Sequence, residues 1–91
     1  MEIPNTGNVL IDFWSPQCGP CVALAPIIDQ IDKDFEDLTV IKINCVDDLA
    51  IAQGFGVMAL PTLIFQKDGE VVKTLVGMQM KHNIVEVIEN L

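Results

Sequence analysis

This chain of 91 residues has few basic residues, no long apolar run and only three cysteines, too few for two disulfides. It has 5 lysines and arginines against 13 acidic residues, which gives a net charge of −8. This balance argues against nucleic acid as a partner, because binding to phosphates depends on lysine and arginine, and it also disfavours anionic membranes. No apolar run approaches the roughly 18 residues of a membrane span. The charge therefore favours solubility.

The beginning of the chain lacks the features of an exported protein. Residues 1–7 have neither the basic start nor the apolar stretch of a signal peptide, and Pro4 and Gly7 predict a loose lead-in. Three cysteines, an odd number, do not suggest a framework of structural disulfides. In the reducing cytosol a disulfide is usually transient and catalytic. We therefore expect a cytoplasmic protein.

Disorder is excluded by the composition. Half of the residues are hydrophobic and few are aromatic, which fits a globular chain. A chain of this length can build one hydrophobic core but not two, and it shows no repeat, linker or low-complexity segment. We predict a single domain over residues 1–91, with residues 1–7 as its lead-in.

Two cysteines placed after a short apolar run are the clearest sign of chemistry. Cys18 and Cys21 follow the run at 9–14 and precede apolar residues at helical spacing. A strand that delivers Cys-x-x-Cys to the start of a helix is typical of intracellular redox proteins. Residues three apart share one face of a helix, so the two sulfurs can form or break a bond with little backbone movement. A structural disulfide or half of a zinc site is the alternative.

The start of a helix also favours a thiolate. Cys18 is expected just before the first turn, where unpaired amides and the helix dipole stabilise an anion. Its pKa would then fall from about 8.5 towards roughly 3.5–7.5. Pro20 suits the first helical position, because its missing N–H would have had no partner there.

Cys45 and His82 are weaker candidates. Cys45, at the end of the second predicted strand, is either a small buried hydrophobic residue or a site of regulatory oxidation or intermolecular pairing. His82 begins the last predicted helix and is expected to be solvated. A zinc site made from these two residues with Cys18 and Cys21 would need unusual ligand spacings. We therefore predict no metal site.

Short apolar runs and apolar residues at steps of three and four predict four strands and three helices. The strands are expected at 8–14, 39–45, 61–65 and 71–76, and the helices from Pro20 to about Glu36, at 47–54 and at about 80–91. The predicted stripe of the first helix is Val22, Ala25, Ile28, Ile31 and Phe35. The long crossover between the first two strands implies a parallel pair. The turn at Asp68-Gly69 implies a hairpin between the last two.

Five landmarks, in order and spacing, resemble thioredoxin from about residue 8 to the C-terminus. They are Asp12-Phe13-Trp14 with Cys18-Gly19-Pro20-Cys21, Pro26 in the following helix, the strand at 40–44, Leu60-Pro61-Thr62 and Val76-Gly77. The resemblance implies an α/β, thioredoxin-like fold of order β-α-β-α-β-β-α, with a four-stranded mixed sheet flanked by helices. The expected strand order is second, first, third, fourth. A lowered cysteine pKa is itself a known property of this family.

The family's usual first strand and helix have no counterpart in this pattern. The second strand is then expected to form an edge of the sheet, and one face would keep only the short helix at 47–54 as cover. Exposed edges and apolar patches favour association. We expect a monomer or a weak dimer.

The resemblance also implies catalytic roles. Cys18 would attack a substrate disulfide, and Cys21 would then attack Cys18 and release the reduced substrate. Asp12 would accept the proton of Cys21, because burial raises the pKa of a carboxyl group towards a useful range; the alternative is a purely structural carboxylate. Lys42 would tune Asp12 by its charge, or it is an ordinary solvated lysine.

The expected substrate surface centres on Pro61, which aligns with the family's cis-proline. Only about 5–6% of X-Pro bonds are cis in folded proteins, so the residues alone predict trans and the resemblance reverses this. Leu60 would supply backbone hydrogen bonds to the substrate. The surrounding flat patch is expected to contain Trp14, Gly19, Pro20, Ala59 and Gly77. Gln17 stands where thioredoxins usually have a tryptophan, and the lost contact area is expected to affect substrate range and the preferred reductase more than the reaction.

We therefore expect a thioredoxin-type protein disulfide reductase with no bound cofactor. The family implies regeneration by thioredoxin reductase, with electrons from NADPH or ferredoxin, and disulfide-containing proteins as substrates. A glutaredoxin-like enzyme recycled by glutathione is one alternative, although Gly19-Pro20 and a buried Asp12 favour thioredoxin. A non-catalytic subunit of a larger complex with the same fold is the other.

Overall fold

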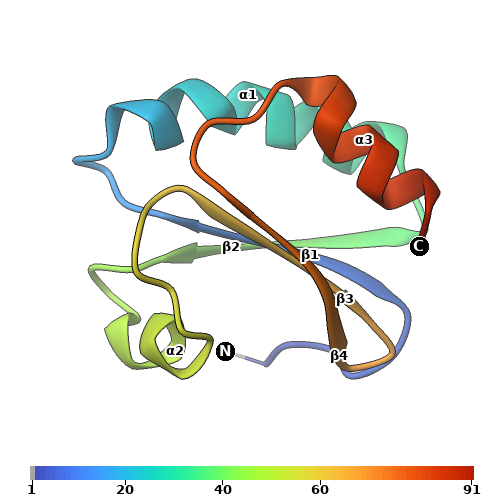
Figure 1. Ribbon diagram of the computed structural model, residues 1–91, viewed down its shortest axis with the longest axis horizontal. Coiled ribbons are helices and arrows are strands. Elements are labelled where there is room, and N and C mark those ends of the chain that lie inside the picture. The colour runs from blue at the N-terminus through green and yellow to red at the C-terminus, as the bar shows by residue number, and fades with distance from the viewer. Residues whose placement is uncertain (1) are drawn as a thin grey trace.

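The order of elements is β-α-β-α-β-β-α, as predicted. The computed structural model describes residues 2–91, and Figure 1 shows the elements along the chain. Their bounds are β1 Asn8–Trp14, α1 Gly19–Asp34, β2 Leu38–Asn44, α2 Leu49–Gly54, β3 Thr62–Lys67, β4 Glu70–Val76 and α3 Lys81–Glu89.

The sheet has four strands in the order β2-β1-β3-β4, which confirms the predicted mixed topology. β1 is parallel to β2 and antiparallel to β3, and β3 forms an antiparallel hairpin with β4. This places the apolar strand β1 in the interior of the sheet, where Asp12 lies between Lys42 of β2 and Leu63 of β3.

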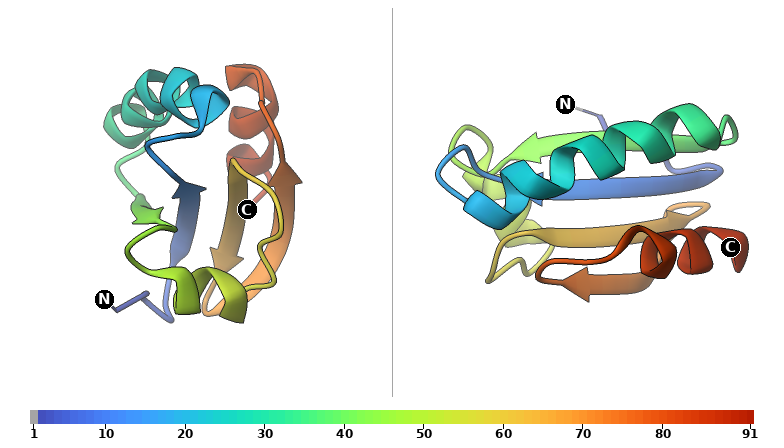
Figure 2. Two further views of the ribbon diagram at one scale, coloured as in Figure 1. Left: turned by 90° about the vertical axis from the view of Figure 1, so that its left-hand side faces the viewer. Right: turned by 90° about the horizontal axis from the view of Figure 1, so that it is seen from above.

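The two faces of the sheet are covered differently. α1 and α3 lie on one face and α2 lies on the other (Figures 1 and 2). The residues buried on the α1 and α3 side include Leu10, Leu24, Ile28, Ile31, Leu63, Phe65, Ile84 and Ile88. The cluster on the α2 side contains Val9, Ile11, Phe13, Ile43, Ala52 and Ile64. β1 contributes to both clusters because its side chains alternate between the faces.

The buried stripe of α1 differs from the predicted one in its first turns. Cys21 and Leu24 are buried there, whereas Val22 is 56% exposed and Ala25 is only half-buried. Both stripes have steps of three and four and both contain Ile28 and Ile31, so periodicity alone does not separate them. The helix continues through the exposed Pro26 and ends at Asp34, before the predicted end at Glu36.

Several element ends also differ by one or two residues. α2 begins at Leu49 instead of residue 47, because the amides of Asp47 and Asp48 bind the carbonyl of Asn44 in a turn. β3 begins just after Pro61. In α3, Met80 precedes the first turn and is 66% exposed, so it is not part of the buried face.

The predicted hairpin turn is present between β3 and β4. Asp68 and Gly69 both have positive φ, 50° and 86°, as a two-residue turn of the mirror-image type requires. The turn also holds the lead-in: Gly7 N–H donates to Asp68 Oδ1 at 2.8 Å, and Asp68 N–H donates to the Gly7 carbonyl at 2.9 Å.

The sequence predicted a loose lead-in, but residues 2–7 lie against the sheet instead. Ile3 packs against the cluster on the α2 side, and the N-terminal segment crosses the same face as α2 (Figure 1). This face has two covers instead of one.

Both edge strands carry a central lysine, Lys42 in β2 and Lys73 in β4, which discourages strand pairing between molecules.

The observed stripe of α1 is tested by a matched pair of substitutions. We expect Leu24→Ala to lower the free energy of unfolding by about 2–5 kcal/mol, because it leaves a cavity in the core. Val22→Ala, in the same helix but exposed, should change it by less than about 0.5 kcal/mol. Urea unfolding followed by circular dichroism measures both, and equal losses would contradict the observed stripe.

Candidate functional site

The cysteine pair lies at the first turn of α1. Cys18 is the N-cap residue, with extended backbone angles, and the Cys21 N–H donates to Cys18 Sγ at 3.2 Å. The two Cα atoms are 5.2 Å apart and the sulfurs form a disulfide. Cys18 is half-buried, whereas Cys21 is 3% exposed. Cys18 is therefore the sulfur that a large substrate reaches first.

A tight turn connects β1 to this helix start. Cys18 N–H donates to the Ser15 carbonyl at 3.1 Å, and Gln17 N–H donates to Ser15 Oγ at 3.2 Å. The helix begins at Gly19, so Pro20 is its second residue, whereas the sequence predicted the first. The second position suits proline equally well, since the first four amides of a helix have no intrahelical partner.

Asp12 is a buried acid on the neighbouring strand. It is 3% exposed, and its Oδ1 has no hydrogen-bond partner among residues 2–91. Burial raises the pKa of Asp12 from 3.8 to about 6; the Lys42 ammonium opposes this rise and the Asp29 carboxylate adds to it. A carboxyl group with this pKa exchanges protons near neutral pH.

A small pocket brings these groups together. It has a volume of about 230 Å³ and is lined by Asp12, Trp14, Cys21, Val22, Ala25 and Lys42. Three of the residues predicted to be catalytic thus share one cavity with Trp14. The cavity is large enough to hold water.

Lys42 reaches across this pocket to α1. Its ammonium forms an ion pair with Asp29, and the two side chains are 38% and 59% exposed. Asp29 was not among the functional residues predicted from the sequence. Its position contains a signal nevertheless, because Cys21, Ala25 and Asp29 follow one another at steps of four and so lie along one face of the helix.

Part of the predicted substrate surface lies in two loops, the one before β3 and the one after β4. The Leu60–Pro61 peptide bond is cis, as the resemblance implied and the residues alone did not. Gly77 N–H donates to the Pro61 carbonyl at 2.8 Å, and Thr62 Oγ1 donates to the Ala59 carbonyl at 2.6 Å. The loops before β3 and after β4 lie at the same end of the sheet as the first turn of α1 (Figure 2), where Gly19 and Pro20 are exposed.

Cys45 and His82 are not part of this arrangement. Cys45 follows β2, is half-buried and packs against the cluster on the α2 side; burial raises the pKa of its thiol. His82 is exposed on α3. Over residues 2–91, no three side chains of the kinds that bind metals come together.

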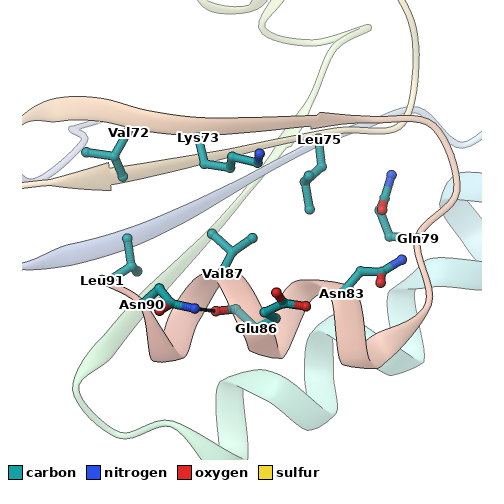
Figure 3. Close-up of a pocket in the computed structure, with 9 residues that line it drawn as sticks. All are labelled: Val72, Lys73, Leu75, Gln79, Asn83, Glu86, Val87, Asn90 and Leu91. Carbon is teal, nitrogen blue, oxygen red and sulfur yellow. Dashed lines mark hydrogen bonds between the residues drawn. The ribbon is translucent and has the colours of Figure 1, made fainter.

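A larger pocket lies on the far edge of the sheet. It has a volume of about 470 Å³ and is lined by residues of β4 and of the segment from Gln79 to Leu91 (Figure 3). Its walls are apolar and amide side chains with Lys73 and Glu86, and it contains no cysteine. Because it lacks a nucleophile, the cysteine end of the sheet is the stronger candidate for the active site.

The comparison with protein-family models gives a match to Thioredoxin over residues 1–90. The chain belongs to the thioredoxin family. Its membership and its cysteine pair make it a protein-disulfide oxidoreductase. In the part of the chain described, no helix has both the length and the apolar character needed to cross a bilayer.

Several thioredoxins are similar in sequence or structure. Thioredoxin from Bacillus subtilis is 43% identical over 85 residues, which are 92% of this chain and 82% of that protein. A mutant thioredoxin from Halobacterium salinarum has a TM-score of 0.89 at 35% identity, over 94% of this chain and 75% of that one. Oxidised mitochondrial thioredoxin 3 from Saccharomyces cerevisiae has a TM-score of 0.88 at 26% identity, over 94% and 80%.

The burial of Asp12 in this thioredoxin-family protein predicts a pH-dependent stability. Since the folded chain holds the Asp12 proton more tightly than the unfolded chain, stability falls as pH rises from about 3.8 to about 6. We expect Asp12→Asn to be more stable than wild type at pH 7, by about 3 kcal/mol. Below about pH 4 the difference should disappear.

Urea unfolding at about pH 3.5 and pH 7 measures this difference. Asp37→Asn, at an exposed acid, is the control and should match wild type at both values. An Asp12→Asn protein that is less stable than wild type at neutral pH would contradict the argument.

Proposed function

We propose that the protein reduces disulfide bonds in other proteins by cycling between a dithiol and a disulfide. The observation that supports this most directly is the order of the two sulfurs, with Cys18 at the accessible start of α1 and Cys21 buried behind it. The buried carboxyl group of Asp12 in the same pocket as Cys21 supplies a proton acceptor.

The first step is attack by Cys18 on a substrate disulfide. In the reduced protein the Cys18 thiolate is stabilised by the first turn of α1, where the Cys21 amide points at the sulfur. The thiolate forms a bond to one substrate sulfur, and the substrate S–S bond breaks. The other substrate sulfur leaves as a thiolate and takes a proton from solvent.

The second step is release by Cys21. Its thiol gives a proton to Asp12, directly or through water in the shared pocket, and the resulting thiolate attacks Cys18. The mixed disulfide breaks, and the second substrate sulfur leaves as a thiolate and takes up the proton held by Asp12. The substrate has gained two electrons and two protons, one from solvent and one from Cys21, and the protein has lost two electrons in forming the Cys18–Cys21 bond. Lys42 adjusts the proton affinity of Asp12 by its charge.

The substrate is held as an extended segment against the loops beside the cysteines. Leu60 would pair with it through backbone hydrogen bonds, as peptides pair with an exposed strand. Contact area would come from Trp14, Gly19, Pro20, Ala59 and Gly77, whereas the predicted Pro61 is fully buried and would act by shaping the loop. Exposed apolar side chains flank these positions, namely Val22, Met58, Val76 and Met78. Flexible methionines suit varied substrates, and they offer contact area that Gln17 does not.

Regeneration would come from a thioredoxin reductase in the cytosol. The electrons would derive from NADPH or ferredoxin bound to that enzyme, while this chain holds no cofactor of its own. The Gly-Pro pair between the cysteines and the carboxyl group behind them favour this route over glutathione.

Cysteine substitutions test the order of events. With dithiothreitol as reductant, we expect Cys18→Ser to lose the ability to accelerate insulin reduction, because the nucleophile is absent. Cys21→Ser should also lose turnover, and when its reduced form is mixed with insulin in the absence of dithiothreitol it should accumulate a mixed disulfide, visible by non-reducing electrophoresis. Cys45→Ser should keep the wild-type rate. Equal slow rates for wild type and Cys18→Ser would contradict the reductase and favour a non-catalytic subunit.

The source of electrons is tested by two coupled assays. We expect NADPH oxidation with a bacterial thioredoxin reductase and insulin to be faster, at equal protein concentration, than turnover with glutathione and glutathione reductase. Wild type and Gln17→Trp should both prefer the reductase over glutathione, and the added contact area of the tryptophan should change only the rate with a given reductase. The opposite preference would identify a glutaredoxin-like enzyme.

A further inference from the structure

The cation nearest to Asp12 in the sheet is bonded to a different acid. Lys42 is the direct partner of Asp12 in the register of β1 with β2, and both side chains line the same pocket. The Lys42 ammonium nevertheless forms its ion pair with Asp29 of α1. Asp12 Oδ1 is left without a hydrogen-bond partner among residues 2–91.

This choice of partner matters because a buried oxygen without a partner is costly. An ammonium group within reach would be expected to bond to it and to hold Asp12 as a carboxylate. Asp29 competes for that ammonium from a more exposed position, with 59% of its side chain accessible. Both members of the pair are far more exposed than Asp12, which stays buried.

We propose that Asp29 is a positioning residue that holds Lys42 away from Asp12, so that the free oxygen of Asp12 can accept the proton of Cys21. The role of the proton acceptor rests on the proposed function. The arrangement of the three charged groups does not, and it can be measured separately.

The charges around Asp12 agree with this assignment. From β2, Lys42 lowers the pKa of Asp12, and from α1, Asp29 raises it. Cys21 of α1 shares the pocket, the partner on β3 is the apolar Leu63, and the Cys45 thiol beyond β2 has its pKa raised by burial and, to a smaller extent, by the charge of Asp12. Loss of Asp29 would remove one charge that favours the proton and would release the cation that opposes it.

The test is the titration of Asp12 by carbon-13 NMR of its side-chain carboxyl group. The oxidised protein is used, because the thiols of Cys18 and Cys21 do not titrate in it. In Asp29→Asn we expect the midpoint of Asp12 to fall by about 1 pH unit, as a closer opposite charge implies. Asp29→Glu, which keeps the charge, should restore the wild-type midpoint. Asp32→Asn, an exposed acid of the same helix, should leave it unchanged.

A second background separates positioning from the direct effect of the charge. If Asp29 acts by holding Lys42, most of the fall should disappear when Asp29→Asn is made in a Lys42→Met protein. An equal fall in both backgrounds would mean that Asp29 acts only through its own charge, and this would overturn the proposal. The absence of any fall in the protein that keeps Lys42 would overturn it as well.

The kinetic consequence is tested on the same variants. With Asp12 a weaker base, the release of substrate by Cys21 should slow several-fold at neutral pH in Asp29→Asn, and the lower limb of its pH profile should move to lower pH. Asp29→Glu should restore both. A midpoint that falls in a protein without reductase activity would support the positioning of Lys42 and overturn the proposed function instead.

Discussion

The hydrogen bond from the Cys21 amide to the Cys18 sulfur connects the chemistry of this protein to its fold. It exists because β1 ends at Trp14 and the chain turns through Ser15 into the first turn of α1. Helix starts have amides without partners, and here one of these amides points at a sulfur. Ser15 holds that turn in place, because its carbonyl accepts from the Cys18 amide and its hydroxyl oxygen accepts from the Gln17 amide.

The two cysteines differ in their exposure and in the groups that surround them. Cys18 is accessible and lies beside the helix amides, whereas Cys21 is buried and shares a pocket with an acid. An accessible thiolate is suited to attack the disulfides of other proteins. A buried thiol next to a base is suited to attack a sulfur within the same protein. Asp12 is retained in the middle of an apolar strand despite the cost of its burial, which is the pattern expected where a group serves function more than stability.

Much of the fold and the position of the cysteines could be predicted from the sequence, because the signals are local. The strand before Cys18, the helix after it and the turn at Asp68-Gly69 each follow from neighbouring residues. What could not be predicted depends on contacts between distant segments. Val22 and Leu24 fit a helical stripe equally well until the sheet selects one face, and the pairing of Lys42 with Asp29 depends on the placement of α1 over β2.

The lead-in shows the same limit, since its polar residues predict a loose segment while Gly7 is bound by Asp68 of the hairpin turn beside it. The placement of the third cysteine has a further consequence. Cys45 packs against the cluster on the α2 side, whereas Cys21 lies in the first turn of α1, which covers the opposite face. The sheet therefore lies between the Cys45 and Cys21 side chains, and Cys45 stays a free thiol while Cys21 is joined to Cys18.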